Sequence, residues 1–277
     1  MNRNVSRILG IVVALVIVAV IGWQLLQSFL TQRQFDEGRA RGEAALEAGD
    51  FVEAESQLEQ SLEAARGLGE QDPRYDESLL KLGEVREAQG KFNDTEYLYL
   101  EALRTRVARF GAVSQPVADM QTRLGNAYLL QDEWLNAEGL YSQAIDTWDQ
   151  LGSSETMAAA SAHLGLGRAM AAQGKLDKAE ISLRRAAGIL EKSEEGDKRQ
   201  LALAYKVLGE VLDQRGMTAD AAKIREQAQA LRAATGLDGM PNLELPSLDQ
   251  TATAAPAEPA QAPTPLAPTP SANTPAM

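Results

Sequence analysis

A Leu-Gly pair that recurs every 42 residues constrains this chain more than any other feature. The pair stands at positions 82–83, 124–125, 166–167 and 208–209. A turn residue follows a few positions later, as glycine at 49, 90, 174 and 216 and as Asp132 in the third copy. A fixed period of this size is typical of repeat arrays, in which each unit buries its apolar face against its neighbours. The period therefore predicts a repeat array.

Two helical patterns surround the turn in each copy. In the third copy, the segment 118–130 carries Met120, Leu124, Ala127 and Tyr128 at steps of three and four. After the turn, one helical face collects Trp134, Ala137, Leu140, Tyr141, Ala144, Ile145 and Trp148. Glycine inside a helix costs about 1 kcal/mol relative to alanine. We therefore expect the glycines of the Leu-Gly pairs to permit close approach of the second helix.

The third copy resembles the tetratricopeptide repeat family. Its residues Leu124-Gly125, Tyr128, Trp134, Ala137, Tyr141 and Ala144 follow that family's pattern. The usual unit has 34 residues, and the longer unit here, with Pro116 before the next helix, is similar to the repeats of kinesin light chains and their bacterial relatives. The resemblance implies an all-α solenoid of about five helical hairpins over residues 35–234, with a concave face lined by the first helices.

The repeat boundaries follow from this period. We place the repeats at 35–68, 76–109, 118–151, 160–193 and 202–234. The first departs from the pattern with Arg41-Gly42, and the fifth with Thr218 and Arg225 at positions that are large and apolar elsewhere. Terminal repeats are expected to be atypical because one of their faces meets solvent. Pro73 and Pro116 are expected in the connections between repeats.

An apolar segment precedes the array. Residues 1–7 form a short basic tail, and no charged residue lies between Arg7 and Arg33. About 20 apolar residues suffice to span a bilayer, so residues 8–30 are predicted to form one transmembrane helix, with Trp23 near one interface. The segment 27–48 lacks proline, and we expect the membrane helix to continue into the first repeat.

A cleaved signal peptide is the alternative for this segment. Cleavage after Gly22 is conceivable, but the region lacks an Ala-x-Ala site and the apolar run continues beyond it. Basic residues lie on both sides of the span, so their count does not fix its orientation. A short basic tail before a first span usually stays in the cytoplasm, which favours an extracytoplasmic repeat domain, periplasmic if the source is bacterial.

The C-terminal segment differs in composition from the array. Nine of the eleven prolines lie between positions 241 and 275, among alanine, threonine, serine and glutamine. Such a segment has too few apolar residues to form a core. We predict that 235–277 is a disordered Pro/Ala/Thr-rich tail that acts as a spacer.

Composition argues against several classes of chemistry. The chain contains no cysteine and a single histidine, His163, which disfavours a zinc site or a hydrolase triad. Gly165-Leu166-Gly167 lies inside a helical repeat and not after a strand, so a nucleotide-binding loop is not expected. The net charge of −12 disfavours nucleic acid as a partner. We expect no cofactor, no bound metal and no enzymatic activity.

The concave face is the remaining candidate site. Phasing by the turn residues places a mostly acidic set of side chains there: Arg39, Glu43, Glu77, Glu84, Glu87, Asp119, Thr122, Asn126, Arg168, Lys206, Glu210 and Asp213. Such a surface favours basic or neutral ligands over acidic ones. The residues with which chaperone-binding relatives clamp a terminal carboxylate are not reproduced, because only Asn126 matches them.

These observations predict a single-pass, membrane-anchored scaffold that binds a protein or peptide partner through its repeat array. Two alternatives stay open. One is a soluble exported repeat protein produced by signal cleavage. The other is an array that self-associates and acts as a structural spacer of an envelope complex.

Overall fold

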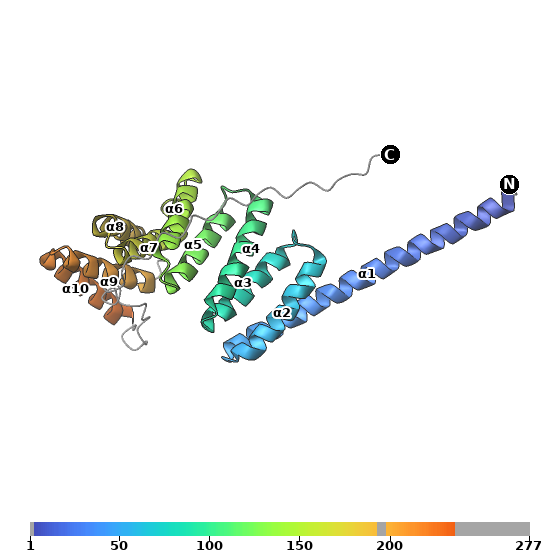
Figure 1. Cartoon of the computed structure of the whole chain (residues 1–277), viewed down its shortest axis with the longest axis horizontal. Helices are drawn as coiled ribbons and strands as arrows, with labels where there is room; N and C mark the ends of the chain where they lie inside the picture. Colours follow the sequence, from blue (N-terminus) through green and yellow to red (C-terminus); the bar gives the residue numbers. More distant parts are fainter. Residues whose placement is uncertain (1–2, 193–197, 236–277) are drawn as a thin grey trace. The chain divides into compact units, whose positions relative to one another are not determined.

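A computed structural model of the chain describes residues 3–192 and 198–235, and every regular element in these ranges is an α-helix. The helices are α1 (Arg3–Glu47), α2 (Phe51–Leu68), α3 (Pro73–Ala88), α4 (Phe92–Phe110), α5 (Gln115–Leu130), α6 (Trp134–Gln150), α7 (Met157–Ala172), α8 (Leu176–Lys192), α9 (Lys198–Gln214) and α10 (Thr218–Thr235). Each helix packs against the next one, so the chain forms a helical solenoid (Figure 1). The predicted tail lies outside the described residues, apart from Thr235.

Five helical hairpins make up the array, and the glycine of each pair lies where the two helices touch. A Cβ atom added to Gly83 would lie 2.3 Å from Cε1 of Tyr99, and one added to Gly167 would lie 2.6 Å from Cγ of Leu183. Gly42 faces Leu58 Cγ at 2.6 Å in the same way, whereas Gly209 faces Arg225 Cγ at 3.3 Å. The predicted close approach is therefore confirmed, it also holds in the atypical first repeat, and it is looser in the fifth.

The turn inside each hairpin has the same backbone conformation. The glycines at 49, 90, 174 and 216 have φ between 72° and 78°, and Asp132 has φ 59° in the third hairpin. This left-handed region suits glycine and tolerates aspartate. In every turn the amide that follows the turn residue donates back into the last helical turn, as Glu133 N donates to the carbonyl oxygen of Tyr128 at 2.9 Å.

Small residues and large ones alternate in the core between the helices. Thr95 and the alanines at 54, 137, 179 and 221 are fully buried at one repeated position. In the third repeat Met120, Leu124, Ala127, Tyr128, Ala137, Tyr141, Ala144 and Trp148 are buried, as predicted. Trp134, Leu140 and Ile145 are partly buried against the same core.

A glutamate links each of the first four repeats to the following one. These linking glutamates are Glu55, Glu96, Glu138 and Glu180, one position after the small buried residue. Lys91 Nζ donates to Glu55, Tyr128 Oη to Glu96, Lys175 Nζ to Glu138, and Arg215 pairs with Glu180. In α10 the same position holds the exposed Ala222. The fifth hairpin thus lacks the side chain that would hold a further repeat, as expected of a terminal unit.

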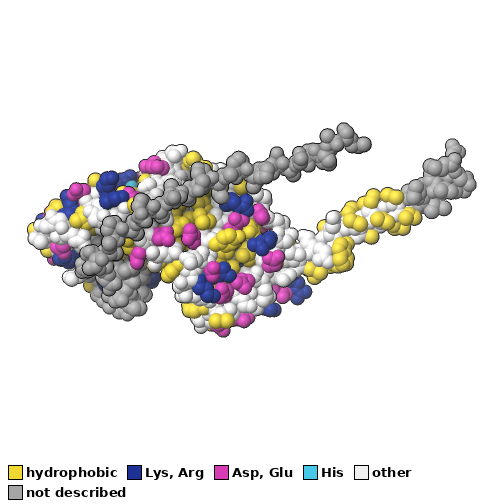
Figure 2. Space-filling view, viewed as in Figure 1, with side chains coloured by type: hydrophobic (Ala, Val, Ile, Leu, Met, Phe, Trp, Pro, Cys, Tyr) yellow, Lys and Arg dark blue, Asp and Glu magenta, His cyan; other side chains and the backbone are white. Residues whose placement is uncertain are grey.

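Helix α1 runs without interruption from the apolar segment into the first hairpin. Its residues Phe35, Gly38 and Gly42 are buried against α2. The preceding residues from Val12 to Leu30 are exposed, and Figure 2 shows the apolar side chains that cover this part of the helix. The predicted continuity of the apolar segment and the first repeat is therefore observed.

Pro73 and Pro116 correct one expectation. Both lie in the first turn of a helix, at the start of α3 and of α5, and not in the connections. Proline is accommodated there because the first amides of a helix have no intrahelical acceptor.

Candidate partner-binding groove

The first helices of the repeats form the inner layer of the solenoid. Helix α5 contacts α7 and α7 contacts α9, although each pair is separated in sequence by an intervening helix. The inner surface of the C-terminal part of α1 and of α3, α5, α7 and α9 is called the groove below. All twelve residues predicted for the concave face lie on these five helices.

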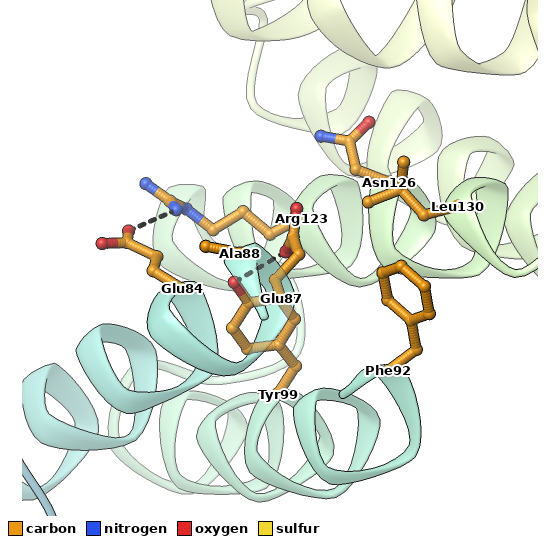
Figure 3. Close-up of a pocket in the computed structure, with 8 residues that line it drawn as sticks. All are labelled: Glu84, Glu87, Ala88, Phe92, Tyr99, Arg123, Asn126 and Leu130. Carbon is orange, nitrogen blue, oxygen red and sulfur yellow. Dashed lines mark hydrogen bonds and ion pairs between the residues drawn. The ribbon is translucent and has the colours of Figure 1, made fainter. Parts of the chain in front are cut away.

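A pocket opens in the groove between the second and third repeats. It has a volume of about 420 Å³ and is lined by Glu84, Glu87, Ala88, Phe92, Tyr99, Arg123, Asn126 and Leu130. These residues come from α3, α4 and α5, and Figure 3 shows their side chains around one opening. This repeat 2–3 pocket combines an apolar wall, Phe92 and Leu130, with carboxylates, a guanidinium and an amide. Ligand sites often combine an apolar wall with a few polar groups in this way.

The two carboxylates of the pocket differ in their partners. Glu84 accepts from Arg123 at 3.0 Å and from Lys81 at 3.1 Å. Glu87 accepts from the hydroxyl of Tyr99 at 3.1 Å and has no ion pair with another of the described residues (Figure 3). Burial raises the pKa of Glu87 and the charge of Glu84 adds to this effect, whereas the Tyr99 hydroxyl and the charge of Arg123 partly offset it. Glu87 is therefore the carboxylate that gains most from a cation in the pocket.

Asn126 is held in place from the second helix of its own repeat. The hydroxyl of Tyr141 donates to Oδ1 of Asn126 at 2.6 Å. The ring of Tyr141 is fully buried between two glycines, Gly125 of its own repeat and Gly165 of the next. This contact explains Gly165, whose role the sequence left open. The amide nitrogen of Asn126, which is exposed, can donate to a ligand.

The structure brings only part of the predicted set together. Glu84, Glu87 and Asn126 line the repeat 2–3 pocket. Arg39 of α1 and Glu77 of α3 form an ion pair at 2.5 Å, which joins the first repeat to the second. Thr122 is buried, and its hydroxyl donates to the carbonyl oxygen of Ala118 in its own helix.

The other predicted residues lie elsewhere on the same five helices. Glu43 lies on α1, Asp119 on α5, Arg168 on α7, and Lys206, Glu210 and Asp213 on α9. Asp213 forms an ion pair with Arg225 of α10. Burial raises the pKa of Asp119, which Arg106 and Arg123 partly counteract.

Sequence reasoning missed the apolar wall and the cation of the pocket. Phe92 occupies the first position of the second helix, where Phe51, Trp134 and Leu176 stand in other repeats. The recurrence of a large residue at this position could have identified Phe92 from the sequence. Arg123 and Leu130 carry no such signal, because their place in the pocket depends on how α5 packs beside α3.

No group of three or more His, Asp or Glu side chains within residues 3–192 and 198–235 is placed to hold a metal ion. His163 is half-buried on α7, and burial lowers its pKa. Its Nδ1 atom is buried without a hydrogen-bond partner among the described residues. These facts fit a packing role for His163.

Comparison with known proteins agrees with this architecture. The chain resembles solved structures of BtubC (BKLC) from P. vanneervenii (22% identity, 85% of this chain and 98% of that one, TM-score 0.64) and of a Podosopora anserina putative kinesin light chain with nearly identical TPR-like repeats (21%, 76% and 98%, 0.60). It also resembles MamA (23%, 76% and 99%, 0.51). These similarities show the fold. A search of curated protein sequences gave no match.

A family model identifies the repeats directly. The tetratricopeptide repeat model matches residues 37–106 and 116–192, which together are more than half of the chain. The match includes the helices that form the repeat 2–3 pocket. The chain therefore belongs to the tetratricopeptide repeat family, with repeats like those of kinesin light chains.

Proposed function

We propose that this protein is a membrane-anchored scaffold that binds an extended segment of a partner protein in its groove. Tetratricopeptide repeats are protein–protein interaction scaffolds, and this is the general role of the array. The single observation that carries the finer proposal is the repeat 2–3 pocket. It offers apolar surface beside Glu87, which forms no ion pair with another of the described residues.

The pocket's chemistry favours a basic side chain as the central contact. A lysine or arginine that enters would place its aliphatic stem against Phe92 and Leu130 and its charged group at Glu87. The partner's charge would compensate the desolvation that raises the pKa of Glu87. The exposed amide of Asn126 would supply a directional hydrogen bond to the partner's backbone.

A peptide selection tests this proposal. The full chain in lipid nanodiscs is used to select from a phage-displayed library of random 12-residue peptides. We expect enrichment of peptides that contain Lys or Arg, and at least tenfold lower retention of them by Glu87→Gln. Glutamine keeps the acceptor for Tyr99 but removes the charge, so the loss reports the ion pair. The double variant Glu84→Lys/Glu87→Lys is expected to abolish binding while helicity is unchanged.

A matched double variant controls for net charge. Asp146 and Glu226 are exposed on α6 and α10 and do not line the pocket. Asp146→Lys/Glu226→Lys changes the net charge by the same amount as the pocket double variant, and we expect it to retain the selected peptides. No enrichment, or equal loss in the two double variants, would refute the groove proposal.

The anchor belongs to the same proposal. Residues 12–30 are apolar or uncharged, and their large apolar side chains are exposed along a helix long enough to span a bilayer. Because α1 continues into the first hairpin, the anchor would hold the groove close to the membrane surface. Confinement there would raise the effective concentration of a membrane partner.

Protease protection on spheroplasts tests the anchor and its orientation. With a tag on the C-terminus, we expect an intact N-terminus in the membrane fraction after alkaline extraction and digestion of the array from outside. Protection of the array would place it in the cytoplasm instead. A soluble form that begins near position 23 would establish signal cleavage and remove the anchor.

A further inference from the structure

Arg168 is a partly buried cation of the groove that has no charged partner among the described residues, whereas Lys206, which also has none, is exposed. It lies on α7 at the position that Glu84 and Asn126 hold in the preceding repeats, 42 residues apart. Arg39 pairs with Glu77, Arg123 with Glu84, and Arg225 with Asp213. Among residues 3–192 and 198–235, the side chain of Arg168 forms neither an ion pair nor a hydrogen bond.

The environment of Arg168 makes its lack of a charged partner destabilising. The residue is half-buried, and burial lowers the pKa of its guanidinium despite the neighbouring Tyr141. A desolvated charge without a partner destabilises the fold, since neither water nor an acid compensates it fully. A carboxylate that approached Arg168 from the groove would recover this cost, and the planar guanidinium can bind it through two parallel hydrogen bonds.

Arg168 continues the surface that begins at the repeat 2–3 pocket. Asn126 lines the pocket and accepts from the hydroxyl of Tyr141. A Cβ atom added to Gly165 would lie 2.7 Å from that same hydroxyl oxygen, so α7 touches Tyr141 there. Arg168 follows Gly165 by three residues and therefore lies on the same face of α7, one turn further along. Asn126, Tyr141 and Arg168, from α5, α6 and α7, therefore connect the pocket to the surface of α7, with the buried Tyr141 beneath it.

The distance between the pocket and Arg168 sets a spacing in the ligand. Helix α5 contacts α7, and the ion pair between Glu84 and Arg123 joins α3 to α5. Packed helices have axes about 8–10 Å apart, so two such steps from α3 to α7 give about 16–20 Å. An extended segment advances about 3.3 Å per residue. A ligand side chain that contacts Glu87 and another that contacts Arg168 would therefore be about five or six residues apart.

We infer that the groove recognises a bipolar segment, in which a basic side chain enters the repeat 2–3 pocket and an acidic side chain about five or six residues away pairs with Arg168. This inference rests on the proposed function and adds the partner's chemical class to it. A single guanidinium matches the single charge of an aspartate or glutamate side chain. The two sites of opposite charge would also fix the direction in which the segment lies.

Synthetic peptides provide the test. The probes are capped 12-residue peptides of Gly, Ala and Leu with one Lys and one Glu at separations from two to nine residues. Their affinity for the full chain in nanodiscs is measured by fluorescence anisotropy. We expect the tightest binding at separations of five or six. Replacing the peptide's Glu by Gln should weaken binding about tenfold to wild type and less than twofold to Arg168→Gln.

Two further variants make the result specific. Lys178, exposed on α8, gives a charge-matched control, since Lys178→Gln should keep the tenfold preference for Glu over Gln. Arg168→Glu should reverse the charge preference. It should bind a peptide in which a second Lys replaces the Glu more tightly than it binds the peptide that carries Glu. Circular dichroism checks that each variant keeps its helices.

Each unfavourable outcome has a distinct meaning. Equal affinity for the Glu and Gln peptides, or no dependence on separation, would overturn the inference while the Lys contact and the proposed function stand. Failure of every Lys-containing peptide to bind would overturn both. A peptide without Glu but with an uncapped C-terminus, if it bound as tightly as the Glu peptide, would show that Arg168 takes a terminal carboxylate, contrary to the inference.

Discussion

Replacing Arg106 by methionine is expected to lower the free energy of unfolding by about 3–5 kcal/mol, because it leaves a buried carboxylate unpaired. Arg106 of α4 donates through Nε to both oxygens of Asp76 in α3, at 2.9 and 3.0 Å, and both side chains are only 12% exposed. Its Nη1 donates to the carbonyl oxygen of Pro116 at 3.0 Å. The residue therefore connects the second repeat internally and also links it to the third.

The pH dependence of this variant has a definite sign. Burial already raises the pKa of Asp76, and Arg106 counteracts this effect. Without Arg106 the pKa of Asp76 in the folded state should rise further above its unfolded value. The folded variant then binds the proton more tightly than the unfolded chain does, so its stability falls as pH rises. The deficit relative to wild type should be smaller near pH 4 than at pH 8.

Urea unfolding followed by circular dichroism at these two pH values measures both effects. Lys223→Met removes an exposed cation whose nearest acid, Asp220, is 3.9 Å away, and we expect no measurable change from it. The double variant Asp76→Leu/Arg106→Met should recover most of the loss, because it removes both charges together. A single variant as stable as wild type at pH 8 would contradict the role assigned to Arg106.

Substituting leucine for either glycine that faces Tyr141 is expected to lower the free energy of unfolding by roughly 1–3 kcal/mol, through overpacking. A Cβ atom on Gly125 would lie 2.9 Å from the ring, and one on Gly165 would lie 2.2 Å from its Cζ atom. The ring is fully buried between the two helices, so it has little space in which to move. Gly165→Leu should therefore be the more damaging substitution.

Gly139 provides the matched control for this prediction. It is an exposed glycine inside α6, and no atom lies within 4 Å of an added Cβ. Gly139→Leu should raise stability by up to about 1 kcal/mol, since leucine has the higher helix propensity. Chemical denaturation of the three variants checks both signs. Equal stability of Gly165→Leu and wild type would mean that α7 does not pack on Tyr141 as described.

The 42-residue period was sufficient to predict the hairpins and their contacts. Helix–helix contact inside a repeat depends on residues close in sequence, such as Gly83 and Tyr99. The atypical character of the fifth repeat was also visible in the sequence, since Arg225 replaces the apolar residue that contacts the glycine of the pair in the other repeats. The prolines were misplaced because their effect depends on where a helix begins, and boundaries are set by a few hydrogen bonds that the periodic pattern does not encode.

The sequence by itself determined the family, the number of hairpins, the positions of the turns and the apolar N-terminal segment, because each depends on the local spacing or composition of residues. Only the tertiary structure decided which charges of the groove are compensated. Glu84 and Arg39 appear equivalent to Glu87 and Arg168 in the sequence, yet the first two have ion-pair partners on neighbouring helices. The difference arises because a partner 38 or 39 residues away is brought close by the packing between repeats, which the spacing within one repeat does not specify.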